Sequence, residues 1–469
     1  MSVFYKIVSK LNVLFFFGFL ALVGCYSNKE VKRPNVLFIA IDDLRPELGC
    51  YGANHIISPN IDELASEGVL FTRAISQAPH CAPSRSSMLS GVHTINHIGN
   101  GVPMRPEELA PGKITLPSSF RKAGYHTVGN GKIYHLREDN EEQSWSEPAF
   151  SLVNGTKENN HLTFHDKASC NFILEKNQRG PFFEAVNVPD NTYIDGQTCD
   201  KTMKDLKRLS QMNKPFFLAC GFVRPHLPFY APKKYWDLYD RDKIEFADNP
   251  YRPKNAPNAL QGSQEFRSYH DRNIEYNSKE FKKIARHGYY ASVSYVDALV
   301  GRLLKTLDEL GLRENTIVVL WGDHGWNLGE HNFWSKHNLL DTSKNTPLII
   351  SAPGFEKNMK MHGIVELLDI YPTLSELAGI PLPEHLEGMS MVPLLQNPEK
   401  EGKEAAFTKW RNGISVTTNN FSYTEWDNNQ RMLFDLKKDP NENENVAKIN
   451  AYASIVIKMK ELLEQSRTR

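Results

Sequence analysis

Four continuous apolar runs mark the chain at residues 35–41, 215–221, 315–321 and 347–353. A strand with one solvent-exposed face alternates apolar and polar residues, whereas a strand buried on both faces is apolar throughout. The four runs therefore predict buried strands, and the first three are typical of a parallel sheet that lies between two layers of helices.

Apolar residues at three- and four-residue spacing predict helices between these strands. Residues 198–212 give an amphipathic helix of this kind. Residues 284–310 give a longer one, with its apolar positions at Val293, Val296, Val300, Leu303, Leu304 and Leu307. Strands and helices of this kind in one chain predict an α/β core. We expect the apolar face of the 284–310 helix to pack in that core, and we assign it no part in the chemistry.

The pattern of long apolar runs and amphipathic helices ends near the segment Asn-Pro-Glu-Lys-Glu-Gly at residues 397–402. Shorter strands are predicted beyond it, followed by a closing helix at 451–464; the strands are expected at 407–410, 414–418, 421–426 and 432–436. We therefore divide the exported chain into a main domain, 34–396, and a smaller C-terminal subdomain, 397–469, built from an antiparallel sheet and one helix.

The N-terminus has the pattern of a targeting segment. Lys6 and Lys10 precede an apolar run at 11–23 that is short for a membrane span. The run ends in Leu-Val-Gly-Cys25, which resembles a bacterial lipobox. Residues 1–24 are thus predicted to be a lipoprotein signal peptide and 25–33 a linker, with lipid on Cys25 anchoring an exported protein in the periplasm or at the cell surface. An ordinary secretory signal is the alternative.

Composition narrows the class of protein. The 469 residues carry no formal net charge, so the chain as a whole has no footprint for binding nucleic acid, and we expect none to bind. A hydrophobic fraction of 40% and a charged fraction of 23% are those of a globular protein. The six cysteines match no zinc spacing; a bridge between Cys170 and Cys199 stays open.

Carboxylates stand directly after two of the buried strands. Asp42 and Asp43 follow the first, and Asp323 and His324 follow the third. Adjacent carboxylates at a strand end repel one another unless a cation lies between them. An oxygen-rich set selects a hard divalent cation, and export favours Ca²⁺ over Mg²⁺. His324 is predicted to bind the metal or to contact the substrate.

The segment Pro-His-Cys81-Ala-Pro-Ser-Arg85 leads into Leu-Ser-Gly at 89–91. A buried cysteine in a turn would be the plain interpretation. However, C-x-P-S-R followed by L-[ST]-G resembles the signature of type I sulfatases. That resemblance implies that a maturation enzyme oxidises Cys81 to formylglycine, whose hydrate is the nucleophile and also contacts the metal.

Other segments extend this resemblance from residue 34 to the C-terminus. Gly-Lys132-x-x-His135 and Pro-His226-x-Pro-Phe are similar to active-site segments of the family, and Lys336 matches its second sulfate-binding lysine. The resemblance implies that Arg85, Lys132 and Lys336 neutralise sulfate oxygens, that His226 protonates the departing alcohol and that His135 assists sulfate release.

The fold implied by the resemblance is that of alkaline phosphatases and sulfatases: a large mixed, mostly parallel sheet between helices, with the small C-terminal sheet and helix. Asp-His-Gly-Trp at 323–326 is similar to the iduronate-2-sulfatase branch.

The sequence therefore predicts a sulfatase acting on a sulfated carbohydrate that contains uronate, of glycosaminoglycan or algal ulvan type. Two alternatives remain at this stage. One is a phosphate or phosphonate monoester hydrolase of the same superfamily, and the other is a catalytically silent surface lipoprotein that binds sulfated glycans.

Overall fold

The computed structural model describes residues 33–95, 105–135, 139, 141–151, 165, 179–269, 273–397 and 399–466. Pro34–Arg469 forms one compact unit. The predicted signal peptide, Cys25 and Cys170 lie outside the described residues, and Cys199 is a buried free thiol. Within the described ranges, no helix has the length and apolar character needed to cross a bilayer.

The core of the unit is an eight-stranded mixed sheet in the order β11-β2-β10-β7-β1-β5-β3, with β12 also paired to β2. Its neighbours β7, β1, β5 and β3 run parallel, whereas β10 is antiparallel to β7 and β2. The strands are β1 (Asn35–Ile41), β2 (Val69–Ile75), β3 (His126–Gly131), β5 (Phe216–Phe222), β7 (Thr316–Gly322), β10 (Asn345–Ser351), β11 (Met359–Met361) and β12 (Val365–Glu366).

Successive residues of β1 enter two separate cores. Leu37, Ile39 and Ile41 pack on one face of the sheet, and Val36 and Phe38 pack on the other, all fully buried. This is the physical reason for a continuous apolar run, because adjacent side chains of a strand point to opposite faces.

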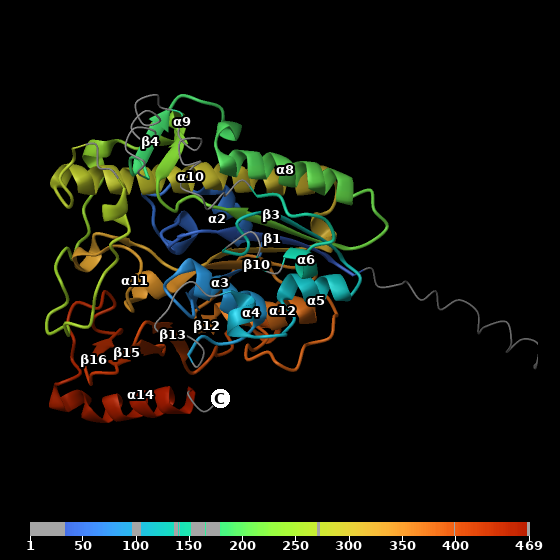
Figure 1. The fold of residues 1–469 in the computed structure, drawn as a ribbon. Helices are drawn as coiled ribbons and strands as arrows, with labels where there is room; N and C mark the ends of the chain where they lie inside the picture. The colour runs from blue at the N-terminus through green and yellow to red at the C-terminus, as the bar shows by residue number, and fades with distance from the viewer. Residues whose placement is uncertain are drawn as a thin grey trace, which may run out of the picture. The chain divides into compact units, whose positions relative to one another are not determined.

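Helices cover both faces of the sheet (Figure 1). The first core includes residues of α2, α8 and α10, and the second includes residues of α3, α5, α12 and α13. The helices are α2 (Pro59–Ser66), α3 (Cys81–Ser90), α4 (Pro106–Leu109), α5 (Leu116–Lys122), α6 (Glu141–Ser144), α8 (Ile194–Leu209), α9 (Lys233–Trp236), α10 (Lys279–Glu309), α11 (Asp341–Lys344), α12 (Ile370–Leu377), α13 (Val392–Gln396) and α14 (Ala453–Ser466).

A second sheet of four antiparallel strands follows, with α14 packed against it (Figure 1). Its strands are β13 (Ala406–Trp410), β14 (Gly413–Thr417), β15 (Phe421–Trp426) and β16 (Arg431–Asp435). Two further pairs are short: β4 (Phe183–Val186) with β6 (Phe229–Pro232), and β8 (Asn327–Leu328) with β9 (Trp334–Ser335). The predicted fold class is confirmed: a mixed, mostly parallel sheet between helices and a small antiparallel sheet with a helix.

We predict that Gly221→Ala destabilises the protein. A Cβ at this position of β5 would lie 2.1 Å from the backbone oxygen of Lys132, and backbone atoms cannot move aside as a side chain can. The expected loss of unfolding free energy is about 1–3 kcal/mol, measured by denaturant titration. Gly262→Ala is the control, because its Cβ would meet only the Phe333 side chain; equal losses in both variants would contradict the prediction.

Candidate active site

The predicted acidic residues converge at the carboxyl ends of neighbouring strands. Asp42 and Asp43 follow β1, Asp323 follows β7, and all three are fully buried. The backbone N–H of Asp43 donates to Oδ1 of Asp323 at 3.0 Å. Residue 43 has a φ of 60°, a left-handed conformation that Asp tolerates better than most residues. Ligand atoms of Asp42, Asp323, His324 and Cys81 all lie within 4.8 Å of one another.

Arg85 and Lys132 compensate part of this negative charge. Nε of Arg85 donates to Asp323 at 2.8 Å, and its Nη2 lies 3.3 Å from Asp42. Nη1 of Arg85 also donates to the carbonyl oxygens of Lys132 and Ile133. The Lys132 ammonium pairs with Asp42. The guanidinium of Arg85 thus ties α3 to the segment that follows β3.

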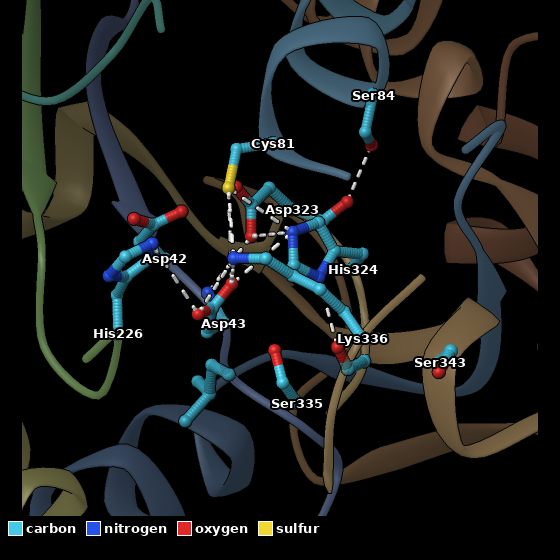
Figure 2. A network of polar contacts seen from close by, with 12 residues as sticks. Asp42, Asp43, Cys81, Ser84, His226, Asp323, His324, Ser335, Lys336 and Ser343 are labelled. Atoms are coloured by element: carbon cyan, nitrogen blue, oxygen red, sulfur yellow. Dashed lines mark hydrogen bonds and ion pairs between the residues drawn. The ribbon is translucent and has the colours of Figure 1, made fainter. Parts of the chain in front are cut away.

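Lys336 is the third buried cation of the site, and Figure 2 shows its ammonium between Cys81 and Asp43. Nζ lies 2.7 Å from Oδ1 of Asp43 and 3.5 Å from Glu265. Burial opposes its charge, but Asp43, Cys81 and Glu265 outweigh burial and hold the pKa of Lys336 well above its usual value. The ammonium therefore stays charged at neutral pH.

Cys81 is the first residue of α3 and is 2% exposed. Its Sγ lies 3.4 Å from Nζ of Lys336 and 3.4 Å from Nε2 of His324. Burial, together with Asp42, raises the pKa of the thiol well above its usual value, although the two lysines oppose this. The unmodified thiol is therefore protonated at neutral pH and is a poor nucleophile.

The structure separates the predicted histidines by position. His324 lies inside the cluster, with Nε2 3.3 Å from Asp43. His226 stands at its edge, with Nε2 3.9 Å from Asp43 and 3.3 Å from Glu265. His135 lies further out, and its ring centroid is 6.0 Å from that of His80, the neighbour of Cys81.

The electrostatics of the two adjacent aspartates differ. Burial disfavours the charge of both, but Lys132, His226 and Arg85 hold the pKa of Asp42 well below its usual range. Burial raises the pKa of Asp43 to about 7, and Asp42 adds to the rise while Lys336 opposes it. The neighbouring protein cations therefore fall short of stabilising the Asp43 carboxylate fully.

This charge balance fits a divalent cation. The site holds four carboxylates, those of Asp42, Asp43, Asp323 and Glu265, against the three cations of Arg85, Lys132 and Lys336. With the histidines left out of the count, these groups carry one net negative charge. A divalent ion among these oxygen ligands would relieve the repulsion at Asp43 and leave one positive charge for an anionic substrate.

Glu265 belongs to the site, although no sequence motif predicts it. It lies in the polar stretch between β6 and α10, which carries no motif. Its carboxylate accepts from Oγ of Ser335 at 2.6 Å and lies beside His226 and Lys336. Only the folded path of this stretch brings the carboxylate to the site.

Comparison with known proteins identifies the arrangement. The model of the Sulfatase family matches residues 34–380. The chain belongs to the sulfatase family. A second model, N-sulphoglucosamine sulphohydrolase, C-terminal, matches residues 329–469. The predicted resemblance is confirmed, and the activity of the family, hydrolysis of sulfuric esters, is that of this chain.

Individual relatives agree with this assignment. Iduronate 2-sulfatase of Mus musculus is 31% identical over 87% of this chain and 83% of its own length. A sulfatase of Formosa agariphila is 32% identical over 93% of this chain and 88% of its own length. An ulvan-active sulfatase of that organism is 28% identical over 89% of this chain and 78% of its own length. The phosphonate monoester hydrolase of Agrobacterium radiobacter shares the fold, with a TM-score of 0.75 at 24% identity, covering 93% of this chain and 96% of its own.

We predict that Arg85→Ala lowers the free energy of unfolding by about 3–5 kcal/mol in metal-free protein, because it leaves Asp42 and Asp323 without their shared buried cation. Denaturant titration in the presence of a chelator measures the loss. The exposed Lys357 supplies the control, since Lys357→Ala should change stability by less than about 0.5 kcal/mol. A loss below about 1 kcal/mol for Arg85→Ala would contradict this account.

Proposed function

We propose that this sulfatase removes sulfate from a uronate-containing polysaccharide or oligosaccharide, using a formylglycine at position 81 and a divalent cation. The observation that carries the proposal is the convergence on Cys81 of a carboxylate cluster and two buried ammonium groups. A divalent ion would leave an excess of positive charge at this site, which is complementary to an anionic sulfate ester.

The residues that would hold the cation are Asp42, Asp43, Asp323 and His324, with position 81 facing them. Ca²⁺ suits this oxygen-rich set and an exported protein better than Mg²⁺. When present, the cation polarises sulfate oxygens and acidifies an oxygen bound to it, and the hydrated formylglycine supplies the nucleophilic oxygen. This oxidised side chain would replace a thiol that the site keeps protonated.

Lys132, Lys336 and Arg85 supply positive charge around the sulfuryl group. Nζ of Lys336 lies 3.4 Å from Sγ of Cys81, so it is in place to contact an oxygen of a group that reacts there. Arg85 acts on the other side by orienting Asp42 and Asp323. Fixed charges of this kind stabilise charge that develops in a transition state without reorganisation.

His226 is our candidate proton donor to the departing sugar alcohol. It is held between Glu265 and the carbonyl of Leu227, which lies 2.6 Å from Nδ1, and it faces the cluster at Asp43. His135 is assigned to the later release of sulfate. Both roles are proposed from the resemblance of these segments to active-site segments of the family.

The substrate class follows two relatives of different origin. One is named iduronate 2-sulfatase and the other ulvan-active sulfatase. We therefore propose either a glycosaminoglycan or an algal polysaccharide as the source of the sulfated unit. We also propose that a maturation enzyme modifies Cys81, and that lipid on Cys25 anchors the exported protein to a membrane in the periplasm or at the cell surface.

Desulfation profiling tests the function. Protein co-expressed with a sulfatase-maturating enzyme should release sulfate from defined 2-sulfated uronate disaccharides or from ulvan oligosaccharides, with aryl phosphate cleaved at least about 100-fold more slowly. Cys81→Ala should abolish sulfate release. Faster cleavage of aryl phosphate, or full turnover by Cys81→Ala, would refute the proposal, and intact folding of the variant is checked by thermal melting.

Metal removal should separate cation binding from catalysis. Chelation is expected to lower sulfate release by at least about 100-fold, with Ca²⁺ restoring more activity than Mg²⁺. Titration calorimetry of the apoprotein should show one Ca²⁺ site, which Asp323→Asn weakens by at least about tenfold because it removes a charged ligand. Undiminished Ca²⁺ binding in Asp323→Asn would overturn the ligand assignment.

A further inference from the structure

A cavity of about 230 Å³ lies beside His337, and no role has been assigned to it. It is lined by residues 259–261, 337–339 and 410–412, together with Trp426 and Asn428. We call it the Trp410 pocket. Its wall includes His337, the residue directly after Lys336 in the chain.

Stacked rings connect the pocket with the nucleophile position. His80 precedes Cys81, and its ring stacks on His337 at 5.1 Å and on Trp410 at 5.6 Å between centroids. His337 and Trp410 are nearly parallel at 4.8 Å. Because Trp410 ends β13, the C-terminal sheet contributes one ring of the stack that includes His80, the neighbour of Cys81.

Two polar groups of the pocket wall lack partners. Asn338 is 2% exposed, and its Nδ2 has no hydrogen bond, although its Oδ1 accepts from the N–H of Leu340 at 3.0 Å. Nε2 of His337 is likewise unpartnered, whereas its Nδ1 lies 2.9 Å from Oγ of Ser263. Most buried polar groups in folded proteins have a hydrogen-bond partner, and an acceptor atom of a ligand in this pocket would supply one to the Asn338 amide.

Arg411 adds a positive charge at the rim. It is exposed at the tip of the β13–β14 hairpin, and its guanidinium lies 5.6 Å from the centroid of the Trp410 ring. Within the described part of the chain, no carboxylate forms an ion pair with Arg411. Its φ of 52° is a conformation that arginine adopts at a cost, in contrast to Gly or Asn. An arginine here is thus available for an anion.

We propose that the Trp410 pocket binds the sugar unit next to the one that is desulfated, and that Arg411 pairs with an anionic substituent on this neighbour. The inference rests on the proposed function. Amide, imidazole and indole groups around a small cavity suit one sugar ring, and guanidinium binds carboxylate and sulfate oxygens with two parallel hydrogen bonds. The enzyme would then recognise two adjacent units of an anionic polymer.

Affinity for oligosaccharides tests the pocket without turnover. In the Cys81→Ala background, titration calorimetry with a heparin hexasaccharide and with an ulvan oligosaccharide should show binding of at least one. Adding Arg411→Asn, which suits the positive φ, should weaken that binding by at least about tenfold, since a charge-assisted contact is lost. Arg411→Lys should recover part of it, and the exposed Lys437 provides the control variant Lys437→Ala.

Turnover gives the second measurement. We expect matured wild type to prefer a 2-sulfated uronate disaccharide with N-sulfated glucosamine over its N-acetylated form, and Arg411→Asn to reduce this preference to below about twofold. No oligosaccharide binding, or equal binding with and without Arg411, overturns the pocket assignment. If matured wild type releases no sulfate from any substrate, including an aryl sulfate, the proposed function is refuted instead.

Discussion

Burial of several like charges at one edge of the sheet is the constraint on which the site depends. Asp42, Asp43 and Asp323 are each fully buried within a few ångströms of one another. Carboxylates cannot remain ionised in such a place without cations, because burial and mutual repulsion both raise their pKa values. The ion pairs of Arg85, Lys132 and Lys336 meet this requirement. Asp42 pairs with two of these cations and Asp43 with only Lys336, so Asp43 is the aspartate that depends more on a further cation.

Strand order explains why residues so distant in sequence meet. The parallel strands β7, β1, β5 and β3 are direct neighbours, so their carboxyl ends form one continuous edge. Asp323, Asp42 and Lys132 each follow one of these strands, and His226 follows β5. Ligand sites occur at this edge in α/β sheets because short loops there can present side chains from several strands at once.

The sequence was most informative where local pattern and motif coincided. Continuous apolar runs predicted β1, β5, β7 and β10 within a few residues, and motifs located the site residues that follow β1, β5 and β7. Strand β2 was missed because Thr72 and Arg73 interrupt its apolar run and because its partner β10 lies far along the chain. Helix α10 begins at Lys279, earlier than predicted, because Phe281 is the one apolar residue among its first five. Its start is capped by Ser278, whose side chain accepts from the N–H of Phe281. Glu265 and Trp410 could not be assigned to the site from the sequence. Their positions depend on the tertiary fold of the segments that carry them, which have no motif.

The α/β core and the C-terminal sheet offer a substrate different kinds of interaction. The α/β core provides dense, buried charge, which suits a small anionic group and offers little to distinguish one sugar from another. The C-terminal sheet brings Trp410 and Arg411 beside His80 and His337, where exposure is greater and contacts are more varied. Because Arg411 is exposed and forms no ion pair with Asp42, Asp43 or Asp323, it can be replaced without removing a partner of these carboxylates. Selectivity among sulfated glycans can therefore vary at the rim while the chemistry at position 81 stays fixed.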